Sequence, residues 1–434
     1  MSKTILLQKA TRIEGNADIN IEVENGRVSV ARFMVQDFRG FEKFLEGKQV
    51  ESVPIMVSRV CGLCCYAHQV AGFRAIEAAI GAGVPRSVDL LRQVGVLGEW
   101  IASHALSYFF LTLPDELGAT HGVFDLVNQY PDLAKEAFFL RKSGTRLLEI
   151  VGKRAVHPMA LGVGRFHVRH TADDLEEIRG LALAVKERTA KLIKNIERRD
   201  LSGNKIPFPA DQETNFFIYD GRPGQEHFRS FNRSGQKVEE FDRDSFEDHI
   251  SELRVDWSLA KFPYLRSLGF PQGIMLVGPL SRLFQAGGIL EDPDLAGYSV
   301  TDKLRQPTAL FLDNVDVCRL LEIFWAAKQI LVLLEQMDLT EMDKADVDLQ
   351  ASGKGIGVVE APRGVLVHSY VVNRGVIDRA RLYVATQFNN AYINMVLRDL
   401  ADGHVEGESI SAVGQELLAH CVRTFDPCLT CATH

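Results

Sequence analysis

Arg59-Val60-Cys61-Gly62-Leu63-Cys64 near one end of the chain and Asp426-Pro427-Cys428-Leu429-Thr430-Cys431-Ala432-Thr433-His434 at the other each contain two cysteines spaced C-x-x-C. Four thiolates that meet form a soft site, which suits zinc, an iron-sulfur cluster, nickel or copper(I). A zinc ribbon usually places its second pair roughly 15 to 20 residues after the first, whereas almost the whole chain separates Cys64 from Cys428. The spacing therefore favours a redox or catalytic metal over structural zinc, and it requires the two ends of the chain to meet.

The other cysteines and the composition are those of an ordinary globular protein. Of the 434 residues, 46% are hydrophobic and 24% are charged, which is typical of a chain with a large core. Seven cysteines make an odd number, which a disulfide framework does not favour. We expect the three outside the pairs, Cys65, Cys318 and Cys421, to be buried packing residues.

Charge and hydropathy exclude several classes of partner. The formal net charge is -8, and no short window is dominated by Lys and Arg, so we expect no nucleic acid and no anionic membrane surface. No uncharged apolar run reaches the roughly 18 residues of a membrane span. The first 15 residues offer only Ile5-Leu6-Leu7, where a signal peptide needs a longer apolar stretch. We therefore expect a cytoplasmic protein without a membrane span.

Apolar residues at helical spacing predict four helices. They cover residues 70–80, residues 87 to about 114, residues 171–196 and residues 318–337. Thr171 and Asp174 resemble a capping box that opens the third helix. The last segment is apolar over so much of its circumference that we expect a central core helix.

Three further regions predict β structure. Residues 18–35 alternate in hydropathy around Asn25-Gly26, as a β-hairpin does. Residues 203–256 predict short strands and loops at the periphery, and residues 355–372 return to β character. No linker and no repeat divides the chain. We expect one α+β domain over residues 1–434, with a mainly helical core bundle, small peripheral antiparallel sheets, and both termini meeting at a buried metal site.

The two cysteine motifs, with His68 four residues after Cys64, resemble the signature motifs of the large subunit of nickel-iron hydrogenases. The resemblance runs through nearly the whole chain. It includes Arg12-Ile13-Glu14-Gly15, Phe38-Arg39-Gly40-Phe41-Glu42, His157-Pro158, Val277-Gly278-Pro279-Leu280, Glu360-Ala361-Pro362-Arg363-Gly364, and Thr386 with Asn389-Asn390. The form of several motifs, including Cys-Ala-Thr-His, is most similar to the cytoplasmic bidirectional branch, which reduces soluble carriers.

This resemblance implies an oxidoreductase that splits H2 reversibly and heterolytically into protons and electrons. The four cysteines would bind nickel, and Cys64 and Cys431 would also bridge to an iron that carries cyanide and carbon monoxide. Cys61 and Cys428 would be the terminal ligands. Soft thiolates stabilise nickel through redox changes, and a basic terminal thiolate can accept a proton.

The resemblance also implies roles above the metals. Arg363, after Pro362, would suspend its guanidinium over the open metal position and pair with Asp426. Thr386 would hydrogen-bond a cyanide, although Ala385-Thr386-Gln387-Phe388 departs from the commoner run. Ser103 stands where many respiratory members have an aspartate, so that charge is missing here.

Two further residues would handle protons and hydrogen bonds near the thiolates. Glu14 would be a proton-relay carboxylate beside a terminal cysteine, which requires reach to the sulfur. His68 would donate a hydrogen bond to a bridging thiolate.

Glu42, His434 and the backbone carbonyl of Leu382 match a second metal position, usually magnesium. Family members carry a C-terminal extension that a maturation endopeptidase removes after the motif's histidine. This sequence stops at His434, so we expect either the mature product or a form that needs no processing.

The chain has no further cysteine cluster, so electrons would leave through the iron-sulfur small subunit of the hydrogenase, followed by further flavin or iron-sulfur subunits. These partners would choose the carrier: NAD(P), ferredoxin, a deazaflavin or a heterodisulfide system. One alternative is the homologous quinone-module subunit of respiratory complex I, which lacks the paired C-x-x-C units. Another is a non-catalytic zinc protein, which would leave Arg363, Glu14 and His434 unexplained.

Overall fold

The computed structural model describes residues 3–118, 122–196, 206–210, 212–221, 226–285, 288–295, 298–305, 311–342 and 347–434. It opens with an antiparallel sheet of β1 (Lys3–Lys9), β2 (Ala17–Glu24) and β3 (Arg27–Val35). Asn25 and Gly26 join β2 to β3 with φ angles of 54° and 73°, as a type I′ turn requires. The predicted hairpin is confirmed.

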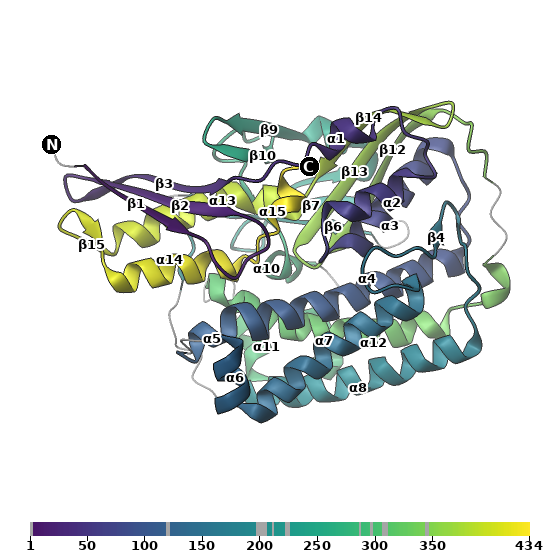
Figure 1. Cartoon of the computed structure of the whole chain (residues 1–434), viewed down its shortest axis with the longest axis horizontal. Helices are drawn as coiled ribbons and strands as arrows, with labels where there is room; N and C mark the ends of the chain where they lie inside the picture. Colours follow the sequence, from purple (N-terminus) through teal and green to yellow (C-terminus); the bar gives the residue numbers. More distant parts are fainter. Residues whose placement is uncertain are drawn as a thin grey trace.

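Four long helices form one side of the molecule (Figure 1). They are α4 (Arg86–Leu106), α7 (Pro131–Gly152), α8 (Ala172–Ile196) and α12 (Val315–Glu335). The capping box of α8 is present, because Thr171 N donates to Asp174 at 3.0 Å and Asp174 N donates to Thr171 Oγ1 at 3.2 Å. Most of α12 is buried, so the expected core helix is confirmed. The sequence reading did not identify α7.

The helix that begins with α4 ends at Glu116, two residues after Pro114, so its expected end near that proline is confirmed. A π-helical segment, Ser107–Thr112, leads into α5 (Leu113–Glu116). Pro114 lies in the first turn of α5, where a missing N–H costs little. The stretch Arg86–Glu116 is long and apolar enough to cross a membrane, but 83% of its apolar window is buried inside the protein, as in a core helix.

Two sheets lie deeper than the expected periphery. In one, β6 (Asn215–Asp220) is buried at every residue, between β7 (His227–Phe231) and the parallel β11 (Met275–Leu276), with β8 (Lys237–Asp242) at the edge. In the other, β12 (Gly353–Ala361), β13 (Gly364–Asn373) and β14 (Val376–Tyr383) are antiparallel, and β13 is mostly buried. Strands covered on both faces carry continuous apolar runs. Residues 203–205, 211 and 222–225 of the expected β region lie outside the described residues.

A row of glycines lets α3 (Cys65–Ile80) lie directly on β12. A Cβ atom at Gly355 would be 2.2 Å from the Ala75 carbonyl oxygen, and one at Gly357 would be 2.1 Å from that of Ala71. Only glycine permits so close an approach of helix and strand. The helix begins five residues before the predicted start and ends at Gly81, whose φ is 67°.

The chain ends beside its N-terminal region. After β14, α13 (Ala385–Asp402) and α14 (Ala412–Thr424) lead to the single turn α15 (Leu429–Ala432). Glu14 forms an isolated parallel bridge with Cys428, and Leu429 N donates to Glu14 O at 3.1 Å. The C-terminus therefore lies inside the fold, far from the N-terminus in Figure 1.

The remaining elements are short. The helices are α1 (Phe41–Leu45), α2 (Val53–Val57), α6 (Val123–Gln129), α9 (Phe246–His249), α10 (Pro279–Arg282) and α11 (Ser299–Leu304). The strands are β4 (Leu161–Gly162), β5 (Arg165–Phe166), β9 (Ile250–Val255), β10 (Ser258–Leu265), β15 (Val405–Glu406) and β16 (Ser409–Ile410). The expected α+β class, with small antiparallel sheets around a helical core, is confirmed.

Candidate metal centre

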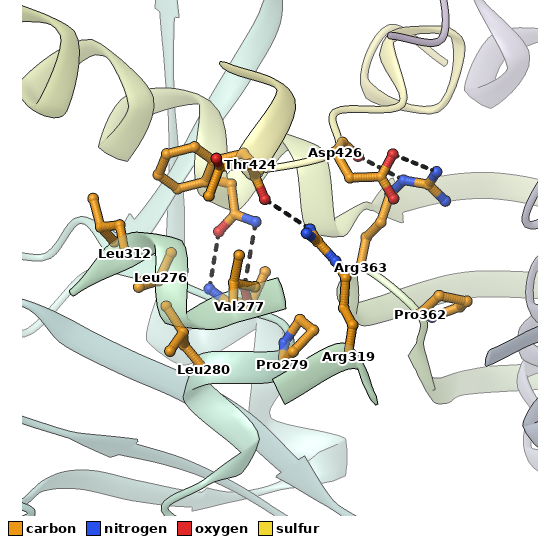
Figure 2. Close-up of a pocket in the computed structure, with 13 residues that line it drawn as sticks. Leu276, Val277, Pro279, Leu280, Leu312, Arg319, Pro362, Arg363, Thr424 and Asp426 are labelled. Carbon is orange, nitrogen blue, oxygen red and sulfur yellow. Dashed lines mark hydrogen bonds and ion pairs between the residues drawn. The ribbon is translucent and has the colours of Figure 1, made fainter. Parts of the chain in front are cut away.

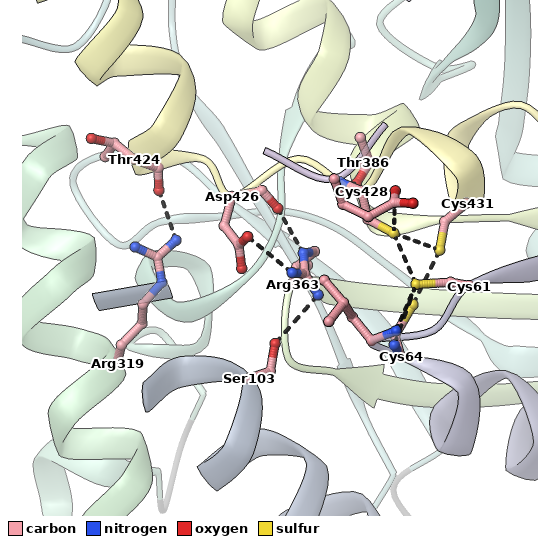
Figure 3. Close-up of polar contacts among 12 residues, drawn as sticks. Cys61, Cys64, Ser103, Arg319, Arg363, Thr386, Thr424, Asp426, Cys428 and Cys431 are labelled. Atoms are coloured by element: carbon pink, nitrogen blue, oxygen red, sulfur yellow. Dashed lines mark hydrogen bonds and ion pairs between the residues drawn. The ribbon is translucent and has the colours of Figure 1, made fainter. Parts of the chain in front are cut away.

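The four cysteines of the two motifs meet at one point, buried in the protein (Figure 3). Cys61 Sγ lies 3.1 Å from Cys428 Sγ, and Cys64 Sγ lies 3.1 Å from Cys431 Sγ. All four sulfur atoms lie within 4.8 Å of one another. Four soft donors this close together can surround one thiophilic ion.

The first cysteine pair is positioned by the start of α3. Cys61 is extended, and its sulfur accepts the N–H groups of Leu63 and Cys64 at 3.1 Å and 3.4 Å. Cys64 is the N-cap residue of α3, but its side chain does not cap the helix. Glu99 of α4 takes that role and accepts from Tyr66 N at 2.9 Å and Ala67 N at 3.1 Å. A carboxylate from another helix thus satisfies the free N–H groups, which leaves the Cys64 sulfur available for a metal.

The second pair lies in extended chain and in α15. Cys428 N donates to Thr386 Oγ1 at 3.0 Å. Thr386 is in the first turn of α13. Glu14 accepts from Thr430 N at 3.1 Å and from Thr430 Oγ1 at 2.6 Å, and its Oε2 lies 3.2 Å from Cys428 Sγ. The Glu14 carboxylate is therefore within proton-transfer distance of one thiol.

Arg363 lies beside the cluster, paired with Asp426 (Figure 3). Its Nη2 is 2.9 Å from Asp426 Oδ1, its Nε donates to the Asp426 carbonyl at 2.6 Å, and its Nη1 donates to Ser103 Oγ at 3.3 Å. Burial opposes the charge, but Asp426 and the cysteines outweigh it and keep the Arg363 pKa above its usual value. Ser103 therefore contacts Arg363, although it lacks the charge of an aspartate.

Backbone geometry at this pair is unusual. Asp426 has a φ of 48°, a left-handed conformation that is uncommon outside glycine and tolerated by Asp. Gly364, directly after Arg363, has a φ of 127°, and a Cβ there would lie 2.7 Å from Gly278 N. The turn that holds Pro362 and Arg363 therefore packs tightly against the Gly278 backbone.

His68 begins a buried chain of hydrogen bonds. Its Nδ1 lies 3.0 Å from His368 Nε2, and His368 Nδ1 lies 2.7 Å from Tyr370 Oη. The other nitrogen of His68, Nε2, is buried without a hydrogen-bond partner among the described residues. Burial lowers the His68 pKa to about 4, so the ring is neutral at pH 7. Its predicted donation to a bridging thiolate stays a prediction.

Glu42 and His434 come together as the predicted magnesium position requires. His434 Nε2 lies 3.5 Å from Glu42 Oε1 and is buried without a hydrogen bond to the described residues. Burial raises the Glu42 pKa, but His434 and Lys261 outweigh it and bring it to about 2. An imidazole nitrogen and a charged carboxylate suit a divalent cation. The group of Leu382 that meets Glu42 is its N–H, at 3.0 Å, and Lys261 Nζ lies 3.0 Å from Glu42 Oε2.

The other three cysteines do not join a metal site. Cys65, Cys318 and Cys421 are buried, and Cys65 accepts from His157 N at 3.3 Å. In the part of the chain that the structure describes, the four-cysteine cluster is the one group of three or more Cys, His, Asp and Glu side chains placed to hold a metal ion.

The sequence reading missed several residues around the site. They are Glu99, Lys261, Arg282, Arg319, Glu322, His368 and Tyr370. A signal was present for some of them. Glu99, Arg319 and Glu322 are charged residues within long apolar helices, where a buried charge needs a partner.

Known proteins resemble this chain over its whole length. The family model described as nickel-dependent hydrogenase matches residues 39–123 and 246–434. One component of the F420-non-reducing hydrogenase of Methanothermobacter marburgensis is 31% identical, over 99% of this chain and 94% of that protein. The beta component of the NAD-reducing hydrogenase HoxS of Cupriavidus necator is 29% identical, over 100% of this chain and 95% of that one.

A solved structure agrees with these relatives. It is that of an NAD+-reducing NiFe hydrogenase in the H2-reduced state, with a TM-score of 0.86 and 26% identity over 100% of both chains. The buried four-cysteine cluster suits the nickel-iron centre of such enzymes. Sequence, fold and thiol geometry agree, and the chain belongs to the family of nickel-dependent hydrogenases.

Proposed function

We propose that this chain is the large, catalytic subunit of a nickel-iron hydrogenase that splits H2 reversibly and heterolytically into protons and electrons. One observation carries the proposal: four buried thiols converge, and the carboxylate of Glu14 lies 3.2 Å from one of them. When bound, a nickel-iron centre with cyanide and carbon monoxide on its iron supplies the redox change and the place where H2 is polarised.

Glu14 moves the proton. Its Oε2 accepts the proton of Cys428 Sγ, while two hydrogen bonds from Thr430 hold the carboxylate in place. Positioning by Thr430 means that the carboxylate needs no rearrangement before transfer. In this proposal Cys61 and Cys428 would be the terminal ligands, and Cys64 and Cys431 would be the bridging ones.

Arg363 provides a fixed positive charge beside the thiols. Asp426 and Ser103 orient its guanidinium, which polarises H2 and stabilises the charge that develops on cleavage. Pro362 shapes the turn. With the centre bound, the Thr386 hydroxyl would donate to a cyanide, and His68 Nε2, which has no partner among the described residues, would donate to a bridging thiolate.

Glu42 and His434 would hold a magnesium ion beside the C-terminal turn. They would supply its carboxylate and imidazole donors, with the backbone of Leu382 adjacent. The ammonium of Lys261 lies between the second Glu42 oxygen, at 3.0 Å, and Glu252 Oε2, at 3.4 Å.

Electrons leave through partner subunits. Four-thiolate clusters are the usual anchors of iron-sulfur wires, and the chain's three remaining cysteines are dispersed. The iron-sulfur small subunit of the hydrogenase, with further flavin or iron-sulfur subunits, therefore carries electrons to NAD(P), ferredoxin, a deazaflavin or a heterodisulfide system. Relatives named as subunits of F420-non-reducing and NAD-reducing hydrogenases favour a soluble, cytoplasmic complex. The chain functions as one domain, and a maturation endopeptidase acts on it transiently.

Metal analysis and infrared spectroscopy of the purified complex test this proposal. We expect about one nickel per chain, one iron beyond those of the partner clusters, and the absorption bands of cyanide and carbon monoxide. Stoichiometric zinc without those bands would overturn it. H2 uptake with an artificial dye tests the reaction without knowledge of the carrier.

A further inference from the structure

We infer that the core helix α12 positions the Arg363–Asp426 ion pair through two buried arginines, Arg282 and Arg319. The inference rests on the proposed function of Arg363. Neither arginine contacts the cysteine cluster directly. Each holds the backbone of one of the two segments that carry the pair.

Arg282, at the end of α10, holds the turn that carries Arg363. Its Nη1 donates to the Ala361 carbonyl at 3.1 Å, and its Nη2 donates to the Pro362 carbonyl at 2.9 Å. Arg282 therefore fixes the carbonyl groups of the two residues that precede Arg363.

Several groups hold Arg282 itself. Its Nε and Nη2 are 2.6 Å and 2.7 Å from the two oxygens of Glu322 in α12, and its Nη1 is 2.8 Å from Glu360 Oε2. The guanidinium lies 4.1 Å from the centroid of the Trp100 ring. A planar guanidinium with this many partners is held in one orientation. The contact of Arg282 with the turn that carries Arg363 is therefore rigid.

Arg319 of α12 holds the segment that carries Asp426 (Figures 2 and 3). Its Nη2 donates to the Thr424 carbonyl at 2.7 Å, and its Nη1 lies 2.5 Å from Asp316 Oδ1 one turn earlier in the helix. Thr424 is the last residue of α14, and Asp426 follows two positions later in its left-handed conformation.

Both anchors depend on the same helix. Asp316, Arg319 and Glu322 all belong to α12, so one rigid element sets the position of both segments. A cavity of about 20 Å³ lies between them, and Arg319, Pro362, Arg363, Thr424 and Asp426 line it (Figure 2). This space is large enough to hold a water molecule. Side-chain packing therefore leaves a gap beside the Arg363–Asp426 ion pair, and the hydrogen bonds of Arg282 and Arg319 hold that pair in place.

Such an arrangement matters because a catalytic charge must be placed accurately. A displacement of about 1 Å can cost roughly 10²-fold in rate. Without the anchors, the turn and the Asp426 segment can shift relative to each other while the ion pair itself persists.

A double-mutant cycle on the purified complex tests the inference. Arg282→Lys keeps the positive charge but cannot reach two carboxylates and two carbonyls at once. Its matched control is Arg92→Lys, because Arg92 is equally buried and contacts both oxygens of Glu77 at 2.8 Å and 2.6 Å and the Gly162 carbonyl at 2.7 Å, away from the site. Each change is made alone and together with Arg363→Lys. The readouts are H2 uptake with a dye, nickel content, melting temperature and the nickel EPR spectrum.

We expect Arg282→Lys alone to lower H2 uptake at least ~10-fold and to shift the EPR line positions at unchanged nickel content. In the Arg363→Lys background it should lower uptake less than about twofold, because residues that act through one another are not additive. Arg92→Lys should lower the melting temperature similarly without either effect.

Equal fold losses in both backgrounds, or an EPR spectrum unaltered by Arg282→Lys, would overturn the inference. If Arg282→Lys yields no folded complex, Arg319→Lys with Asp426→Asn gives the same cycle for the other anchor, judged by the same criteria. Zinc in the unmodified complex, or an Arg363→Lys variant with full activity, would instead contradict the proposed function.

Discussion

Cys64 lies at the start of α3, a helix of 16 residues, whereas Cys428 and Cys431 flank and occupy α15, a helix of four residues. The first pair is therefore held by a long element that packs on β12 and is capped by Glu99. The second pair is held by side chains from distant parts of the sequence: Glu14 contacts Thr430 and Cys428, and Thr386 accepts from Cys428 N. Arg363 contacts Asp426, two residues before Cys428. A helix therefore sets the geometry of the first pair, whereas individual tertiary contacts set that of the second.

Substitution of Arg363 should cause the largest loss of activity, because it removes a contact beside the second cysteine pair. Arg363→Lys removes the planar guanidinium that contacts Asp426 and Ser103. We expect H2 uptake to fall roughly 10³-fold, the scale of losing one positioned electrostatic group, with nickel content unchanged. Dye-linked H2 uptake and metal analysis measure both. A variant that keeps half of the activity would show that the charge is not required.

Substitution of Glu14 should slow proton transfer while leaving the metals in place. Glu14→Gln keeps an acceptor for Thr430 but cannot take a proton from Cys428. We expect roughly a 10²-fold loss in H2 uptake and in the exchange of deuterium with water protons. Asp37→Asn is the control, because Asp37 is a neighbouring carboxylate that accepts from Asn16 N at 2.8 Å and does not reach a thiol. Unchanged exchange in Glu14→Gln would remove it from the relay.

Asp115 joins the two segments that hold the second pair, so its substitution should loosen their connection. It pairs with Arg12, two residues before Glu14, and accepts from Arg423 Nε at 2.7 Å, three residues before Asp426. Burial raises the Asp115 pKa, but His420, Arg12 and Arg423 outweigh it and lower it to about 2, below its usual 3.8.

A carboxyl with a lowered pKa in the folded state stabilises the protein above its usual pKa, and this stabilisation is lost as the pH falls through the folded value. We expect Asp115→Asn to lower the free energy of unfolding by about 2 kcal/mol at pH 7, with the difference shrinking toward pH 2. Denaturant unfolding at several pH values measures it. Glu177→Gln, in an exposed pair with Arg146, should change little. A difference for Asp115→Asn that does not depend on pH would contradict this origin.

The smallest effect should come from the caps of the two cysteine segments. Thr386→Val removes the acceptor of Cys428 N, which we expect to cost about 1 kcal/mol and to lower nickel retention against a chelator. Glu99→Gln should cost a similar amount, but should leave nickel retention unchanged because packing on β12 still holds α3. Equal nickel loss in both variants would contradict the proposed difference between the first and second cysteine pairs.

Local features of the fold were predictable from sequence. The hairpin around Asn25-Gly26, the capping box at Thr171 and the core helix around residues 318–337 depend on short-range spacing, and all three are present. The depth of β6 and β13 was not predictable, because burial on both faces depends on which helices cover a strand. Pro114 marked the end of the helix that begins with α4 to within two residues, whereas the π-helical segment before it was not predictable from hydrophobic spacing.

The candidate site was predictable to the extent that its residues belong to sequence motifs. The four cysteines, Glu14 and the Arg363–Asp426 pair come together as expected. Supporting residues such as Arg282 and Arg319 act on backbone carbonyls, and no side-chain pattern reveals which carbonyl an arginine will reach. Lys261 at Glu42 is a similar case, because it comes from a strand far away in the sequence.

The glycines of β12 control how closely the strand that leads to Arg363 packs on the helix that begins at the first cysteine pair. Along β12 the positions run from Gly353 beside Ala79 to Gly357 beside Ala71, so the strand advances toward Arg363 as the helix leads back toward Cys64. Because these glycines have no side chains, α3 packs closely on β12, and this packing helps to set the distance between Arg363 and the first cysteine pair. Replacing one of these glycines with alanine would push α3 away from β12. The Arg363 guanidinium would then move away from the Cys61 and Cys64 thiols, even though every residue of the site itself is unchanged.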